Sequence, residues 1–328
     1  MKRWIAWLGV AVMLLTLTAC SACGQMEEPP TSDGGATAVA RKLGMGSVNT
    51  VSMEGTERAN VKVTVAALVL DGDGKIADCA VDELTFTVAL AGGLPQAVEN
   101  FLSKLEMGDE YLPNASDTGT SDAATRPWHE QVEAFCDYAE GKTPAQMSGL
   151  ATTDGKSGEI KGCDLIITDF IQAVSLAAGE AKAQKVGAGD DLELALTATK
   201  AEGATDEKPQ YDVEMAAVTV GEGDRITGCI TDTLQAKLTV AEGVFSTLSG
   251  GIQTKRQMGN GYGMKAASAI DREWYEQANA FDTFAVGKTA EELAGTKLNS
   301  EGKTDAITGC TVAVTGMLKN AVKAANQE

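Results

Sequence analysis

The chain has 328 residues with 27 basic and 46 acidic side chains, which gives a formal net charge of −19. A surface this acidic argues against nucleic-acid binding, which needs clustered Lys and Arg, and suits solubility outside the cell and cationic partners. Aromatic residues make up 5% of the chain against 36 glycines, so its cores must be built mainly from Val, Leu, Ile and Ala.

The N-terminus is predicted to be a targeting segment rather than part of a fold. Lys2 and Arg3 precede an apolar run, residues 4–17, that is too short to span a bilayer as an ordinary helix. The run ends in Leu-Thr-Ala followed by Cys20, which resembles the lipobox at which bacterial lipoproteins are cleaved and lipidated. We therefore expect residues 1–19 to be a lipoprotein signal peptide and Cys20 to carry the lipid. A plain secretory signal is one alternative, and processing at Cys23 is another.

Residues 20–41 form a polar segment that includes Pro29-Pro30 and Gly34-Gly35. This composition is typical of a flexible tether, which would hold the folded part outside the cell while Cys20 anchors it to the membrane. Removing the leader takes away two basic residues and leaves 25 against 46 acidic ones, a mature charge of −21. Release of a peptide pheromone ending near Ala19 stays open as a further role of the leader.

Beyond the tether the chain repeats itself. Trp128-His-Glu-Gln131, followed by Gly141-Lys-Thr143, returns as Trp274-Tyr-Glu-Gln277, followed by Gly287-Lys-Thr289, at an offset of 146 residues. This period is far above the ~20–50 residues of a solenoid unit, and each copy is of a size to bury its own core. We predict two homologous domains, residues 42–184 and residues 185–328.

Each copy is predicted to begin with a β-hairpin. Residues 61–70 alternate apolar and polar side chains up to Asp71-Gly-Asp-Gly74, a hairpin turn, and residues 211–220 lead to a matching turn. The return strands, residues 76–90 and 226–240, are expected to keep one apolar face throughout their length. The predicted unit is therefore an antiparallel sheet followed by helices.

The helices are predicted from apolar spacing and capping residues. Trp128 and Trp274 each open a helix whose apolar residues recur at helical spacing, so we expect both rings in the core rather than stacked on a cofactor. The repeated Gly-Lys-Thr lacks the first glycine of a phosphate-binding loop. It is read instead as a helix stop, followed by new helices with capping boxes at Thr143 and Thr289.

The titratable residues form no catalytic constellation that we can recognise. Asp82 and Asp232 fall on the apolar face of the return strands, so each needs partners, either in a local hydrogen-bond network or in a ligand site. The single histidine, His129, has Tyr275 as its counterpart, so a histidine mechanism common to both copies is excluded. A calcium-binding EF-hand loop that began at Asp71 would require glycine at its sixth position, which is Ile76 here. We therefore expect no metal site.

Cysteines recur at equivalent positions of the two copies. An exported protein can form disulfides, and the repeat suggests one bridge within each copy, Cys79–Cys163 and Cys229–Cys310. The alternative is that these four are small buried residues that never meet.

The second copy ends in Asp305-Ala-Ile-Thr308-Gly309-Cys310-Thr311, ahead of an apolar-periodic helix. This run resembles the flavinylation motif of FMN-binding domains, Asp-x-x-Ser/Thr-Gly-Ala-Thr, with Cys310 in place of the usual Ala. The resemblance implies α+β domains with a small, mainly antiparallel sheet. It also implies a flavin transferase that joins FMN through a phosphodiester to Thr311. We expect Thr311 at a helix N-terminus, where free backbone N–H groups favour a phosphate.

The equivalent run of the first copy departs from the motif, because Gly158 replaces the leading Asp and Asp164 replaces the acceptor Thr. An aspartate cannot form the phosphodiester, so we expect no covalent flavin there. The resemblance implies an electron carrier that exchanges electrons with redox partners, with no catalytic residues of its own. The alternative is a flavin-free binding or structural lipoprotein on the same scaffold.

Overall fold

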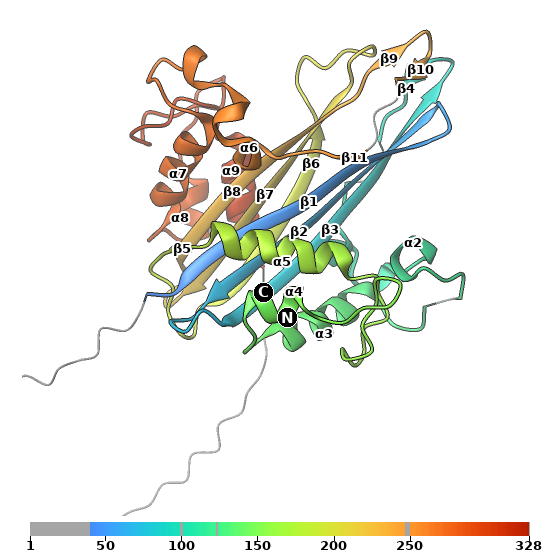
Figure 1. Cartoon of the computed structure of the whole chain (residues 1–328). Helices are drawn as coiled ribbons and strands as arrows, with labels where there is room; N and C mark the ends of the chain where they lie inside the picture. Colours follow the sequence, from blue (N-terminus) through green and yellow to red (C-terminus); the bar gives the residue numbers. More distant parts are fainter. Residues whose placement is uncertain (1–39, 99–100, 123, 247–249, 328) are drawn as a thin grey trace, which may run out of the picture. The chain divides into compact units, whose positions relative to one another are not determined.

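Two antiparallel meanders form the framework of the computed structural model, which describes residues 40–327 apart from residues 99–100, 123 and 247–249. The first meander runs through β1 (Lys42–Glu54), β2 (Arg58–Leu70) and β3 (Ile76–Ala91), and the second through β6 (Asp191–Lys200), β7 (Gln210–Gly221) and β8 (Arg225–Lys237) (Figure 1). Short strands pair at the edges: β5 (Lys182–Ala183) and β11 (Gly250–Gly251) with β1, β4 (Leu94–Pro95) with β3, and β9 (Val240–Ala241) with β10 (Val244–Phe245). These antiparallel sheets and the helices packed on them agree with the predicted α+β class.

The predicted leader, its lipidation site Cys20 and the tether up to residue 39 lie outside the described residues. No helix in the described part of the chain is both long and apolar enough to cross a membrane.

The predicted hairpin turn at residues 71–74 is confirmed. The Asp71 carboxylate accepts hydrogen bonds from the backbone N–H groups of Asp73 and Lys75, each at 2.9 Å. Gly74 completes the turn with a φ of +76°, a conformation that glycine adopts without the steric cost of a Cβ atom. The strands that flank the turn pair along their whole length.

The return strands do not keep a single face, which corrects the prediction. The register shifts between Val69 and Leu70 of β2, and Ala77 is the extra residue of a β-bulge in β3. A bulge reverses the alternation of side chains on its two sides. Ile76 therefore packs on the same side as Cys79, against the helices. β8 has the same register shift at the equivalent position.

Helices follow each meander in the same order. The first set is α1 (Lys104–Met107), η1 (Gly108–Glu110), α2 (Ala115–Thr118), α3 (Trp128–Ala139), α4 (Pro144–Ser148) and α5 (Thr168–Glu180). The second set is α6 (Lys255–Met258), η2 (Gly259–Tyr262), η3 (Lys265–Ala267), α7 (Trp274–Ala285), α8 (Ala290–Ala294) and α9 (Thr315–Ala325). The predicted capping boxes are present, because the Thr143 and Thr289 hydroxyls accept from the backbone N–H groups of Gln146 and Glu292.

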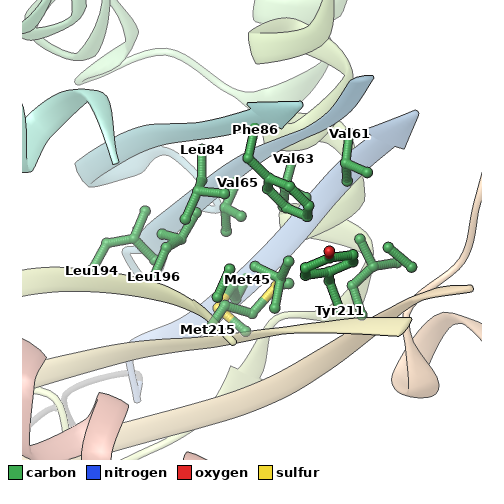
Figure 2. Close-up of a cluster of buried hydrophobic side chains, with 14 of the residues drawn as sticks. Met45, Val61, Val63, Val65, Leu84, Phe86, Leu194, Leu196, Tyr211 and Met215 are labelled. Atoms are coloured by element: carbon green, nitrogen blue, oxygen red, sulfur yellow. The ribbon is translucent and has the colours of Figure 1, made fainter. Parts of the chain in front are cut away.

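The inner faces of the two sheets pack against each other and share one hydrophobic core. Figure 2 shows side chains of both sheets meeting in this layer, among them Val61, Phe86, Tyr211 and Met215. Each outer face carries a separate core with its own helices: α3, α4 and α5 on the first sheet, and α7, α8 and α9 on the second. The layers thus run helix, sheet, sheet, helix. The sequence had led us to expect that each copy buries its own core. Instead, both halves contribute to the core between the sheets, and residues 40–327 form one compact unit.

Trp128 and Trp274 are core residues, as predicted, with 1% and 3% of their surfaces exposed. Each ring also contacts a lysine ammonium group. Lys104 Nζ lies 5.4 Å from the centroid of Trp128, and Lys255 Nζ lies 5.0 Å from that of Trp274. A cation over an indole face is attracted by the ring quadrupole, so the two lysines are held in equivalent places by the same interaction.

A carboxylate accompanies each of these lysines, from buried Glu83 in the first half and half-buried Glu214 in the second, and it comes from a different strand in each half. In the first half Glu83 of β3 accepts a hydrogen bond from the Thr64 hydroxyl of β2 at 2.9 Å. In the second half the pair is exchanged, and Glu214 of β7 accepts from the Thr233 hydroxyl of β8 at 2.7 Å. Lys104 forms ion pairs with both Glu83 and Asp117. For Glu214, burial is the main effect and raises its pKa to about 7.

Asp82 and Asp232 anchor the starts of the short helices α1 and α6. The Asp82 carboxylate accepts from the backbone N–H groups of Glu83 at 2.7 Å and of Leu105 at 3.1 Å. Asp232 makes the equivalent pair of hydrogen bonds in the second half, at 2.7 and 3.1 Å. A local hydrogen-bond network is therefore present around both residues, which was one of the two interpretations of their position.

The half-buried Glu214 carboxyl predicts a pH-dependent stability. Its folded pKa of about 7 lies above the ordinary value of 4.5, so the folded state binds the proton more tightly. Its contribution to the free energy of unfolding is therefore present below about pH 4.5 and is lost as the pH rises towards 7. Replacing Glu214 with Gln should stabilise the protein at pH 8 relative to wild type by about 2–3 kcal/mol more than at pH 5. Urea unfolding at both pH values measures this difference.

The matched control is Glu291→Gln, which removes a carboxylate from an exposed position on α8. A Glu214→Gln variant that follows the wild type in parallel between pH 5 and pH 8 would contradict the assignment.

Candidate functional site

The loop that carries the motif connects α8 to α9 and contains a tight turn at residues 307–310. The backbone N–H of Cys310 donates to the Ile307 carbonyl at 3.3 Å, and Gly309 has a φ of +84°. Ile307 and Cys310 point into the helix–sheet core of the second half. Thr308 and Thr311 remain exposed, so the turn presents its hydroxyl side chains to solvent.

Thr311 is held in place by Gln277 of α7. The Gln277 side-chain carbonyl accepts from the Thr311 backbone N–H at 2.8 Å and from its hydroxyl at 3.1 Å. Gln277 is fully buried, and its amide donates to the Arg272 carbonyl and to the Ser268 hydroxyl, each at 3.2 Å. With both ends of its amide engaged, Gln277 cannot rotate without breaking several hydrogen bonds. The position of the exposed Thr311 hydroxyl is therefore well defined.

Thr311 does not lie at the start of a helix, which corrects the prediction. Helix α9 begins at Thr315, after the cap residue Val314. Val314 is buried, and its backbone N–H donates to the Gly302 carbonyl at 2.8 Å, which ties the start of α9 to the earlier part of the same loop. Thr311 thus precedes the first residue of α9 by four positions.

A cationic side chain lies beside this turn instead. The Arg272 guanidinium donates to the Gly309 carbonyl at 3.5 Å. It approaches so closely that a Cβ atom at Gly309 would stand 2.4 Å from the Arg272 Nη1 atom, so only glycine fits without a shift. Asp305, the leading acidic residue of the motif, is exposed. A phosphate on Thr311 would have the Arg272 charge as its nearby counterion.

The first half builds the same loop with a different residue at its tip. The backbone N–H of Asp164 donates to the Gln131 side-chain carbonyl at 2.8 Å, as Thr311 does to Gln277. The Gln131 amide donates to the Arg126 carbonyl at 3.1 Å, and the Arg126 guanidinium donates to the Gly162 carbonyl at 2.9 Å. Gly162 has a φ of +91°. The support is equivalent, but Asp164 offers a carboxylate where Thr311 offers a hydroxyl.

The supporting residues Gln277 and Arg272 were not identified from the sequence as part of the site. A signal was present, because the glutamine belongs to the repeated Trp-x-Glu-Gln block and Arg126 recurs as Arg272 at the same offset of 146. Both copies keep this support although only one keeps the acceptor threonine. A side chain retained in both halves therefore marks the scaffold of the loop, and Thr311 marks what is special to the second half.

The predicted disulfides are not present in the structure. All five cysteines among the described residues are free and buried. Cys79 lies within hydrogen-bonding reach of Cys136 of α3, and this contact and burial raise the pKa of the Cys136 thiol. Burial also raises the pKa of the Cys163, Cys229 and Cys310 thiols. Instead of pairing as Cys79–Cys163 and Cys229–Cys310, these residues fill the helix–sheet cores.

Comparisons with known proteins give one short match. No protein-family model matches the chain, and no solved structure matches it. A stretch of 41 residues is 42% identical to a chlorophenol reductase of Desulfitobacterium hafniense. This stretch is 12% of the present chain and 12% of the reductase, so the similarity covers a small part of either protein.

The buried Gln277 makes a testable prediction about the loop. Gln277→Leu removes the acceptor of Thr311 and strands the Arg272 carbonyl, so it should lower the free energy of unfolding by about 2 kcal/mol. The backbone amide of Thr311 should also exchange with deuterium faster. Gln277→Glu retains an acceptor for that amide and should keep more of its protection. Hydrogen exchange read by mass spectrometry distinguishes the two variants.

Gln131→Leu is the matched control, because it should release the loop at Asp164 and leave that at Thr311 unchanged. Equal exchange at Thr311 in wild type and Gln277→Leu would show that the glutamine does not hold the loop.

Proposed function

We propose that this protein is a membrane-anchored, extracytoplasmic flavoprotein that carries FMN on Thr311 and serves as an electron carrier. The observation that supports this most directly is the hydroxyl of the exposed residue Thr311, fixed by buried Gln277 directly after a turn whose Gly309 carbonyl contacts the cationic Arg272. An acceptor for a bulky group must be accessible, and a phosphodiester benefits from a nearby cation. The resemblance of residues 305–311 to the flavinylation motif supplies the identity of the group.

The residues of the loop fit this group. Thr311 would hold FMN through the phosphodiester, Gly309 would let the backbone come close, and Arg272 would balance the negative charge. Cys310 points into the core, so its replacement of the usual alanine leaves the exposed surface of the motif unaltered. When bound, FMN supplies the redox chemistry of its isoalloxazine ring, while the protein positions it.

The proposal includes two homologous FMN-binding-type domains, residues 42–184 and 185–328. It is supported by the matching order of strands and helices, by the shared bulge, and by the two equivalent glutamine-supported loops. In this view the second domain carries the flavin, and the first is a partner that stabilises it through the common inter-sheet core.

A flavin-free binding or structural lipoprotein is the second candidate. It is favoured by Asp164, because the first half keeps the whole loop support without an acceptor hydroxyl. The loop geometry alone therefore does not require a flavin. The short match to the chlorophenol reductase does not bear on the choice.

Attachment of FMN can be tested by mass. Coexpression with a flavin transferase should add one FMN-sized mass to the wild type and none to Thr311→Ala. Thr311→Ser should still be modified, since it keeps the hydroxyl. The cost of the alanine substitution to folding should be small, about 1 kcal/mol, because it removes one hydrogen bond, that of the Thr311 hydroxyl to Gln277. Intact-chain mass spectrometry, with unfolding as a check, measures both quantities.

The first half provides a gain-of-function control. Gly158→Asp combined with Lys161→Thr and Asp164→Thr would rebuild the motif on a loop with the same support, and a Cβ atom at Gly158 meets no other atom within 4 Å. This variant should take up a second FMN. A wild-type chain with no added mass would remove the flavin proposal and leave the flavin-free scaffold as the better account.

Membrane anchoring is tested at the leader. Cys20→Ala should block lipidation, and the protein should then fail to be processed at this site and should lose its lipid-dependent attachment. Cell fractionation with detergent partitioning, and the mass of the mature N-terminus, give the answer. Cys23→Ala is the matched control. Unchanged processing and membrane attachment in Cys20→Ala would show that Cys20 is not the anchor.

A further inference from the structure

A cavity of about 1090 Å³ opens between the two halves, away from the Thr311 loop. Its walls are the outer edge of β1, the facing edge of β8, and parts of α5, α6 and α7. Met45, Leu176, Ile230 and Ile252 give it an apolar lining, and Leu176 of α5 is 38% exposed there. Neither Thr311 nor Gln277 lines it. The cavity is therefore a separate feature of the fold.

One wall of the cavity is a gap in a row of paired strands. Two short strands already pair antiparallel with the outer edge of β1: β5 opposite Lys42 and Leu43, and β11 opposite Thr50 and Val51. Ile252, which directly follows β11, donates its N–H to the Asn49 carbonyl on the same edge. Between Leu43 and Asn49, residues 44–48 have no strand neighbour on that edge in the described part of the chain. Five residues of a strand span about 17 Å, which is room for a short extended segment.

The backbone groups that face this gap follow from the pairing at its ends. The carbonyls of Arg41 and Asn49 accept from Gln184 and Ile252 on this edge, so the odd-numbered residues direct their backbone groups outward. The Ser47 carbonyl accepts from the Gln257 side-chain amide at 2.7 Å. The N–H and carbonyl of Met45 and the N–H of Ser47 remain directed towards the cavity.

On the opposite wall of the cavity, side chains already provide hydrogen-bond partners for the backbone of β8. The edge of β8 is covered by side chains: the Gln184 amide pairs with both the N–H and the carbonyl of Cys229, at 3.0 and 3.2 Å. Asp282 accepts from the Thr231 N–H at 3.1 Å. These side chains take the hydrogen bonds that a neighbouring strand would make, so unfilled backbone groups lie on the β1 side alone.

The other edge of the sheet pair is closed. There β3 packs directly against β6, and an ion pair between Lys323 and Glu106 at 2.7 Å bridges the halves. Two halves with the same order of elements thus differ at their two junctions. The opening at β1 is a property of one junction and not a general looseness of the packing.

From this arrangement we infer that the gap in the β1 edge is a binding site for an extended peptide segment of a partner protein. The segment would lie antiparallel to β1, in line with β5 and β11, and pair with the backbone of Met45 and Ser47. Its carboxyl end would then lie beside β5, where the exposed Lys182 and Lys185 line the cavity together with one exposed acidic residue, Glu180, so that the basic charges are in excess. The chemistry recognised is an extended chain with apolar side chains and an acidic residue at that end.

The test begins with a random heptapeptide library displayed on mRNA, selected against the full-length wild type. A Ser175→Trp variant, which places a large ring in the cavity from α5, serves for counter-selection. Ser148→Trp on the exposed face of α4 is the matched control and should bind like the wild type. Enriched peptides should carry apolar residues followed by Asp or Glu, and Lys182→Gln with Lys185→Gln should weaken them several-fold.

The decisive measurement is an N-methyl scan of an enriched peptide by fluorescence anisotropy. Methylating an amide that faces β1 should weaken binding at least about tenfold, and methylating an outward amide should leave it within about twofold. Failure to enrich any peptide family, or binding indifferent to N-methylation, would overturn the inference. Thr311→Ala should bind equally well, so the outcome is independent of the proposed flavin.

Discussion

The shared core between the two sheets is the constraint on which the rest of the structure depends. Helices cover the outer face of each sheet, and the inner face is apolar. Exposing that inner face to water would be unfavourable for either half alone. Val61 and Tyr211 show the result, with 0% and 2% of their surfaces exposed although they come from different halves. Packing two faces side by side also fixes which strand edges meet. The edges of β3 and β6 close on each other, and the edges of β1 and β8 leave a cavity between them.

Local chemistry was enough to predict much of the fold. The turn at Asp71, the helix that opens with Trp274 and the capping box at Thr289 each depend on residues close together in the sequence, and each was found as predicted. The bulge at Ala77 was missed because one inserted residue leaves an alternating pattern almost unchanged while it exchanges the faces. The common core was missed for a different reason. An apolar face in the sequence pattern predicts that the face is buried, but it does not predict which part of the chain packs against it.

The candidate site shows the same limit. The motif identified Thr311 but not the side chain that holds it, since Gln277 lies 34 residues away in the sequence. The helix after the motif was predicted to begin too early, because the apolar spacing is compatible with either start. The deciding contact is the hydrogen bond from Val314 to the Gly302 carbonyl, a link across a loop that no local pattern reveals.

Comparison of the two halves separates scaffold from chemistry. The carboxylate and its threonine partner exchange strands between the halves, as Glu83 with Thr64 and as Glu214 with Thr233. A carboxylate still lies beside the equivalent lysine in each half. A structural requirement permits such an exchange, because either strand can supply the charge. The exchange of Thr311 for Asp164 has no such compensation, since nothing else in the first loop supplies a hydroxyl at the tip. A position that the fold needs is thus restored by another residue, whereas a position that only the chemistry needs can simply be lost.

Helix α7 contributes to both features of the second half, and its geometry explains how they can operate separately. Gln277 supports the Thr311 loop, whereas Asp282 faces the edge of β8 at the cavity. Five residues along a helix turn the side chain by about 140°, so the two point to different sides of α7. Between them Ala278 and Phe281 are fully buried in the helix–sheet core, which fixes the helix axis. Because close-packed cores resist small displacements, a group on Thr311 and a peptide beside β1 could be bound at the same time without competing for one conformation of the helix.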